Sequence, residues 1–254
     1  MRNIKGISTY MIKIIAVLFM VIDHIGVAFS GTILHDSYLV FRYIGRVSFP
    51  LFAFLLVEGV KYTKNKWKYL RNMLIFTIIS EIPFDLLFYG WQDRSKGINV
   101  FATLTIGLFG MIIVEYLIEK WKNKKVRYII PIIAIIVFVP LCFIANHFNT
   151  DYAGMGPLLI FMLYVFQKWG KHIIKKGNQR TLNIFASVAI IGWMVLYDVL
   201  AGEISELYGI LAIVPILFYN GTKGSYKISK WVFYIFYPAQ MLFLYLFNYF
   251  VFLT

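Results

Sequence analysis

Two adjacent ionisable residues, Asp23 and His24, lie in the second half of the apolar run Ile14–Phe29. On insertion scales, an aspartate at the centre of a membrane-spanning helix costs about 2.5–3.5 kcal/mol, so such a residue is by default a functional-site hypothesis. An imidazole is also the side chain best suited to moving protons near neutral pH. We therefore predict that His24 acts as a general base. The alternative interpretation is a buried neutral histidine that donates one hydrogen bond to a neighbouring helix.

Two further pairs of charged residues are spaced four apart, which places the members of each pair on one helix face. Arg42 and Arg46 form the basic pair, and Glu81 and Asp85 form the acidic pair. At about 1.5 Å per residue, both pairs lie roughly 5–12 Å inside the same end of their predicted helices. The pairs match in depth and oppose in charge, which predicts ion pairs between these two helices. Their role is either to join the helices or to contact a substrate, and the sequence leaves both open.

Asp23 points about 100° around the helix from His24, because an α-helix has 3.6 residues per turn. This offset predicts that Asp23 pairs with an arginine and not with the neighbouring ring. Another carboxylate is then needed to orient His24, and we assign that role to Glu81. Further polar residues are expected at the same depth: Asn99, Thr103, Asn146 and Asp151.

The composition is that of a protein with many membrane-spanning helices. Of its 254 residues, 60% are hydrophobic and 15% charged, whereas soluble domains have about 45–50% apolar and about 25% charged residues. The net charge of +13 does not indicate nucleic-acid binding, because the lysines and arginines occur in short bursts between apolar runs, as in cytoplasmic loops. Cys142 is the single cysteine and is interpreted as a buried structural thiol. We find no metal-ligand spacing, P-loop or dinucleotide-binding motif in the sequence.

Apolar windows of about 20 residues, the length that crosses the hydrocarbon, predict an all-α, polytopic transmembrane bundle of about nine spans. Alternate loops carry nearly all of the basic residues, which predicts a cytoplasmic N-terminus and an external C-terminus. Because the loops are short, residues 1–254 are expected to form a single integral membrane domain. The predicted spans are Tyr10–Ser30, Leu39–Val60, Trp67–Tyr89, Ile98–Glu119, Val126–Asn146, Tyr152–Gln167, Thr181–Ala201, Leu207–Asn220 and Trp231–Leu253.

Short motifs of polar, glycine and aromatic residues are distributed along the chain. They are Ile22–Gly26, Arg42–Phe54, Glu58-Gly59, Ser80–Asp85, Asn99–Leu104, Asn149–Tyr152 with Gly154 and Gly156, and Phe236–Pro238. Together, and in this order, they resemble the motifs of the TraX-type conjugal pilin acetylases and their chromosomal relatives. The chain departs from that pattern at Gln240, where a histidine is expected after Tyr-Pro. This departure leaves His24 as the candidate catalytic histidine.

The resemblance implies a multi-pass protein of the bacterial plasma membrane that acetylates a protein amino terminus, with acetyl-CoA as donor and without a metal. Because acetyl-CoA is cytoplasmic, we expect basic inner loops to hold its phosphates while the pantetheine arm threads between helices towards His24. The acceptor, a pilin- or lipoprotein-like amine or a glycan hydroxyl, would enter from outside. Direct transfer is preferred to an acetyl-histidine, and Arg46 or Asn99 would stabilise the oxyanion. We assign catalysis to His24, Asp23 and Glu81, and substrate or cofactor binding to Arg42, Arg46, Asp85, Asn99, Asp151 and Tyr152.

Two other functions are alternatives to acetyl transfer. A proton-coupled secondary transporter would use Asp23, His24, Glu81 and Asp85 as a relay, but such transporters often contain inverted repeats, and we see none in the sequence. A non-catalytic membrane scaffold would have little reason to bury so many charges. Binding of acetyl-CoA separates the enzyme from both alternatives.

Overall fold

The computed structural model describes residues 6–90, 96–120, 126–173, 178–202, 204–224 and 229–253. All regular elements in these ranges are helices, so the predicted all-α class is confirmed; the only bridges in these ranges are the isolated pairs Ile7–Tyr219 and Ile98–Thr150. The elements are α1 (Thr9–Phe29), α2 (Tyr38–Gly45), α3 (Ser48–Tyr62), α4 (Lys66–Phe88), α5 (Val100–Lys120), α6 (Val126–His147), α7 (Met155–Ile173), α8 (Gln179–Ala201), the 3₁₀ helix η1 (Ile204–Ala212), α9 (Ile213–Leu217), α10 (Lys230–Asn248) and the short π-helix η2 (Tyr249–Leu253).

Six helical segments are long and apolar enough to cross a membrane, and two shorter apolar helices, Met155–Lys168 and Ile204–Leu217, accompany them. The protein is therefore membrane-embedded, whereas the count of about nine spans and the cytoplasmic N-terminus stay predictions. The six segments are Thr9–Phe29, Tyr38–Tyr62, Val100–Lys120, Ile129–His147, Gln179–Ala201 and Trp231–Phe252.

The predicted continuous helix Leu39–Val60 is wrong in one respect, because the chain interrupts it between Gly45 and Ser48. Pro50 explains the interruption. In an unbroken helix its missing N–H would remove a hydrogen bond and its ring would clash with the preceding turn. At the third position of a new helix, the N–H has no intrahelical partner to lose. Pro215 likewise occupies the third position of α9.

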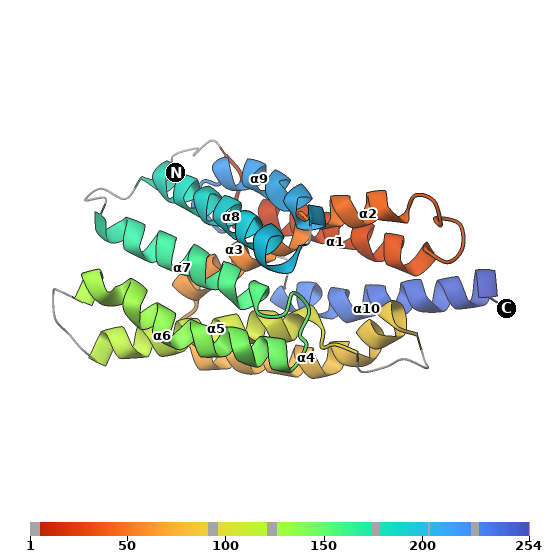
Figure 1. The fold of residues 1–254 in the computed structure, drawn as a ribbon, viewed down its shortest axis with the longest axis horizontal. Coiled ribbons are helices and arrows are strands. Elements are labelled where there is room, and N and C mark those ends of the chain that lie inside the picture. Colours follow the sequence, from red (N-terminus) through yellow and green to blue (C-terminus); the bar gives the residue numbers. More distant parts are fainter. Residues whose placement is uncertain are drawn as a thin grey trace.

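The helices lie roughly along one long axis, with the N-terminus near one end and the C-terminus at the other (Figure 1). At the first end, Ile7 bridges Tyr219, and the hydroxyl of Tyr62 donates to the carbonyl of Gly221 at 2.7 Å. Lys66 and Lys168 both bind Glu115 there. The loops that meet there are the predicted cytoplasmic loops, which carry most of the lysines. We call this the lysine-rich end.

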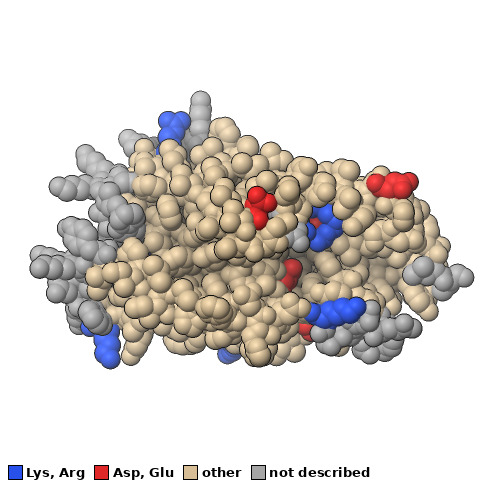
Figure 2. Space-filling view, viewed as in Figure 1, with Lys and Arg blue, Asp and Glu red and all other residues tan. Residues whose placement is uncertain are grey.

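The core runs through the bundle, with a large contribution from α3, and α7 packs against both α5 and α8; fully buried Leu108, Ile160 and Trp193 belong to it. Many large apolar side chains remain exposed, such as Ile78 at 75% and Val199 at 73%. Exposed apolar surface on this scale is expected of a protein that faces lipid. Figure 2 shows the same property as broad uncharged surface on one face, with charged side chains at its ends and around one hollow.

Candidate active site

His24 is buried, at 5% exposure, where α1 faces α4 and α10. Its Nδ1 contacts the side-chain amide of Gln240 on α10. The imidazole packs edge-on against Phe88, with ring centroids 5.7 Å apart, and at a tilt against Tyr237, at 5.8 Å. The prediction that Glu81 orients this ring is therefore wrong, and Gln240 takes that position. An amide orients an imidazole without adding a charge, which keeps the ring available as a neutral base.

Asp23 faces the other way, towards α2, as the offset of about 100° between neighbouring helix positions requires. Its carboxylate forms an ion pair with Arg42, so the prediction that it pairs with an arginine is confirmed. The helices approach so closely here that a Cβ on Gly45 would lie 2.2 Å from Asp23 Oδ1, and a Cβ on Gly26 would lie 2.6 Å from Phe41 Cβ. Glycines at both positions therefore bring the Asp23–Arg42 pair together.

Arg46 pairs with Glu206 of η1, with Nη1 and Oε1 2.9 Å apart, and Tyr152 belongs to the same electrostatic environment. The predicted pairing of Arg42 and Arg46 with Glu81 and Asp85 is thus wrong. Glu206 lies between the predicted spans Thr181–Ala201 and Leu207–Asn220, so sequence reasoning treated it as a loop residue and did not include it in the site. The 3₁₀ helix η1 instead packs against α2, α3 and α8 and buries Glu206 to 2% exposure.

Glu81 and Asp85 line the adjacent side of the site, on α4. The side-chain amide of Asn99 donates to the carboxylate of Glu81 and to the carbonyl of Thr77, at 2.8 Å for the latter. These bonds fix the start of α5 against α4. Asp85 is 7% exposed, and its Oδ1 has no hydrogen-bond partner among the described residues.

The loop between α6 and α7 carries Asp151 and Tyr152 into the bundle. The backbone N–H of Asp151 donates to the carbonyl of Ile98 at 2.7 Å, and the hydroxyl of Thr103 donates to the carbonyl of Asp151. Tyr152 has a φ of 62° and stacks on Phe49 with centroids 3.8 Å apart. Strained backbone of this kind costs of order 1–3 kcal/mol and clusters at functional sites.

Burial raises the pKa of Asp151 to about 6, although the guanidinium groups of Arg46 and Arg42 act in the opposite direction. The carboxylate thus belongs to the same electrostatic environment as the two arginines. We call Asp23, Arg42, Arg46, Asp151, Tyr152 and Glu206 the polar cluster.

The polar cluster keeps unused hydrogen-bonding capacity. Asp23 Oδ1, Arg46 Nε and Glu206 Oε2 are buried and have no hydrogen-bond partner among the described residues. Such atoms are rare in proteins, and each calls for an explanation. In Figure 2, acidic and basic side chains surround the hollow near the start of α7. In the part of the chain that the structure describes, no group of three His, Cys, Asp or Glu residues is arranged to hold a metal.

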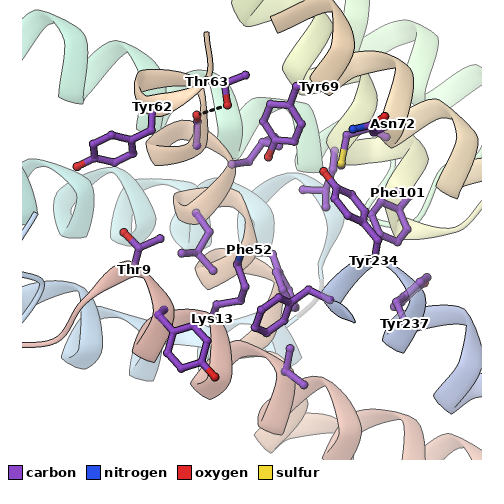
Figure 3. Close-up of a pocket in the computed structure, with 18 of the residues that line it drawn as sticks. Thr9, Lys13, Phe52, Tyr62, Thr63, Tyr69, Asn72, Phe101, Tyr234 and Tyr237 are labelled. Carbon is purple, nitrogen blue, oxygen red and sulfur yellow. Dashed lines mark hydrogen bonds between the residues drawn. The ribbon is translucent and has the colours of Figure 1, made fainter. Parts of the chain in front are cut away.

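A cavity of about 690 Å³ lies between α1, α3, α4, α5 and α10. Lysines line it towards the lysine-rich end: Lys13, Lys68 and Lys223. Figure 3 shows Thr9, Lys13 and Tyr62 at one end of the cavity and Phe101 and Tyr237 at the other. Sequence reasoning predicted basic inner loops and a passage between helices, but it did not identify these walls.

The cavity and the polar cluster lie on two sides of His24. Tyr237 lines the cavity and contacts the His24 ring. On the other side, Arg42 pairs with Asp23, and its guanidinium lies 5.8 Å from the centroid of the Phe88 ring that packs on His24. A neutral imidazole between an apolar cavity and a charged cluster is suited to general base chemistry on two substrates that approach from opposite sides.

Comparisons with known proteins agree with one another. A family model described as "TraX protein" matches residues 8–248. The chain is 26% identical to "Probable fimbrial assembly protein FimC, serogroup H1" of Dichelobacter nodosus over an alignment of 263 residues. The alignment covers 94% of this chain and 95% of that protein. No solved structure matches the chain significantly.

Proposed function

The chain belongs to the TraX family, and from this premise we propose that it is an integral membrane acetyltransferase of the bacterial plasma membrane. The donor is cytoplasmic acetyl-CoA, and the acceptor is the amine of a protein amino terminus on the extracytoplasmic side. The similarity to a protein named for fimbrial assembly favours a pilin-type acceptor over a lipoprotein or a glycan.

The observation that carries this proposal is the cavity that begins among lysines and ends at the ring packed on His24. From Thr9 to Met20, both of which line it, α1 rises by about 16 Å, so the cavity is long enough for an extended arm. Lysine ammonium groups at the mouth supply positive charge for phosphates. The aromatic and aliphatic walls then exclude water from the thioester, which strengthens electrostatic interactions within the site.

In the proposed reaction, Nε2 of His24 takes a proton from the acceptor amine as its nitrogen attacks the thioester carbonyl. The C–N bond forms, the C–S bond breaks, and the departing thiolate receives the proton from the imidazolium. Gln240 positions the ring at Nδ1. For Nε2 to act as the base, the amide must present its oxygen to the Nδ1–H of His24, because an amide nitrogen that donates to Nδ1 would leave the ring proton on Nε2. This direct transfer needs fewer steps than an acetyl-histidine.

Arg46 is the better of the two predicted oxyanion donors. The side-chain amide nitrogen of Asn99 already donates to Glu81 and to Thr77, whereas Arg46 keeps a buried Nε without a partner among the described residues. An oxyanion donor worth about 3–4 kcal/mol in the transition state is typical of acyl transfer.

The proposal is tested with purified protein in detergent micelles. We expect acetyl-CoA to bind and free CoA to compete with it. We also expect Lys13→Ala with Lys223→Ala to weaken binding by about tenfold or more, because two charges near the phosphates are removed. Lys120→Ala is the matched control, because Lys120 is an exposed lysine in the last turn of α5 that does not line the cavity. Absence of binding, or equal effects of all three substitutions, would contradict the proposal.

Transfer is then followed by mass spectrometry of a peptide with a free pilin-type amino terminus. We expect the wild type to add one acetyl group and His24→Ala to lose activity by about 10²–10⁴-fold, the usual contribution of a general base. A folded His24→Ala protein that transfers acetyl at the wild-type rate would remove His24 from the reaction. Proton flux coupled to substrate uptake, without acetyl transfer, would favour the transporter.

A further inference from the structure

Tyr237 belongs both to the cavity and to the immediate surroundings of His24. Its ring lines the cavity together with Phe101 and Met20, and it packs on the imidazole at 5.8 Å. Met20 lies one helical turn before His24 on α1, but His24 itself is not among the residues that line the cavity. Tyr237 therefore forms part of the cavity wall on the side where the imidazole packs, and Figure 3 shows it with Phe101 at the same end of the cavity.

This wall is held rigidly. Tyr237 is 4% exposed. Phe101 packs edge-on against the same ring, with centroids 5.1 Å apart. Because the ring is fixed on both its edge and its face, it cannot be displaced without loss of packing at three helices. Insertion of extra methylenes into such a site is destabilising.

We infer that Tyr237 restricts the donor to very short acyl thioesters and so determines the acyl-chain specificity of the transfer. The inference rests on the proposed function, because it takes the cavity as the donor site and His24 as the base. An acetyl group adds only a methyl beyond the thioester carbonyl. A propionyl or butyryl chain that reaches His24 needs the space that the Tyr237 and Phe101 rings occupy.

The rest of the cavity does not impose this limit. Its middle is lined by Phe52, Leu55 and Leu56, which are apolar and offer no polar group that rejects a longer hydrocarbon chain. Tyr234 also lines the cavity and lies one turn before Tyr237 on α10. Its ring stacks on Phe76, with centroids 4.9 Å apart. Discrimination by chain length is thus localised at the end of the cavity that Tyr237 and Phe101 form. Tyr234, whose ring also stacks on Phe101 with centroids 6.0 Å apart, provides a control for the loss of an aromatic ring from the cavity wall.

The experiment compares acetyl-, propionyl- and butyryl-CoA as donors for the same peptide amine, as kcat/KM ratios. The wild type is expected to prefer acetyl over butyryl by about 100-fold or more, because butyryl is two methylenes longer and each methylene costs about tenfold or more in a tight pocket. Tyr237→Ala should reduce this preference by about tenfold, and Tyr237→Phe, which keeps the ring, should retain it. Tyr234→Ala should change activity on all three donors alike. If Tyr237→Ala does not fold, Tyr237→Leu makes the same comparison with a smaller loss of volume.

The outcomes separate this inference from the proposed function. Equal use of acetyl and butyryl donors by the wild type, or an unchanged ratio in Tyr237→Ala, overturns the role of Tyr237 and leaves the acetyltransferase intact. A wild type that transfers no acyl group from any donor overturns the proposed function, and the specificity wall with it. A broadened ratio in Tyr234→Ala equal to that of Tyr237→Ala would place the limit elsewhere in the cavity.

Discussion

The buried ion pair between Arg46 and Glu206 distinguishes a structural role of these charges from a role in binding. The nitrogen and oxygen are 2.9 Å apart, and the side chains are 18% and 3% exposed. At this separation the attraction between unit charges is about 6 kcal/mol for an effective dielectric constant of about 20. Desolvation offsets much of that attraction, so the pair adds little net stability. Removing one partner, however, leaves the other charge buried and costs about 3–5 kcal/mol.

We therefore expect Glu206→Leu and Arg46→Met each to lower the free energy of unfolding by about 3–5 kcal/mol. The double substitution should recover part of that loss, with a coupling energy of about 1–3 kcal/mol. The assay is unfolding of the purified protein in mixed detergent micelles, followed by the loss of helical signal. Asp36→Asn is the control, because the contact between Asp36 and His35 is fully exposed, and it should change stability by less than about 0.5 kcal/mol.

Additive effects of the two substitutions would refute this reasoning, because they would show that the two side chains do not interact energetically. Acetyl transfer provides the second readout. If the double variant regains stability but transfers no acetyl group, Arg46 contributes to the reaction beyond holding η1 in place. If it regains both, the pair is structural only.

Three further outcomes follow from the site geometry. Because the folded-state pKa of Asp151 is about 6 and its unfolded value is near 3.8, the unfolded carboxyl ionises first, so the contribution of Asp151 to stability is most favourable below pH 4 and falls as pH rises to about 6. Asp151→Asn removes this dependence, and it should be the more stable protein at pH 7 by up to about 3 kcal/mol in thermal unfolding and equal to wild type below pH 4. Gly45→Ala should cost about 1–3 kcal/mol, because its Cβ would lie 2.2 Å from a carboxylate oxygen. Gly31→Ala, with no atom within 4 Å, should be neutral in the same unfolding assay, and equal effects would contradict the close-approach argument. Gln240→Leu should lower kcat for acetyl transfer by about tenfold or more with little change in the Kd for acetyl-CoA, because His24 loses its only described hydrogen bond. An unchanged kcat would show that the amide does not position the ring.

Much of the helical framework was predictable, because the signals that place helices, hydropathy and the positions of proline and glycine, are local in the sequence. The run around Asp23 and His24 is one helix, α1, as predicted, and the two side chains point to different neighbours. The interruption after Gly45 was not predicted, although Pro50 carries the signal for a new helix start.

The partners of the charged residues were less predictable, because depth and charge do not decide which helices are neighbours. Arg46 and the acidic pair of α4 match in depth, yet packing places η1 beside α2 and gives Glu206 to Arg46. Gln240 was noted only as a departure from an expected histidine, and only the packing of α10 on α1 and α4 shows that it faces His24.

The most direct test of the account is a sidedness measurement in sealed vesicles that contain the protein in one orientation. Acetyl-CoA carrying a labelled acetyl group is supplied at the lysine-rich face, and a pilin-type peptide with a free amino terminus is supplied at the other. We predict labelled peptide with wild-type protein, and none above background with His24→Ala that folds and binds acetyl-CoA normally. Labelling that is independent of His24, or that requires donor and acceptor on the same face, would contradict the account.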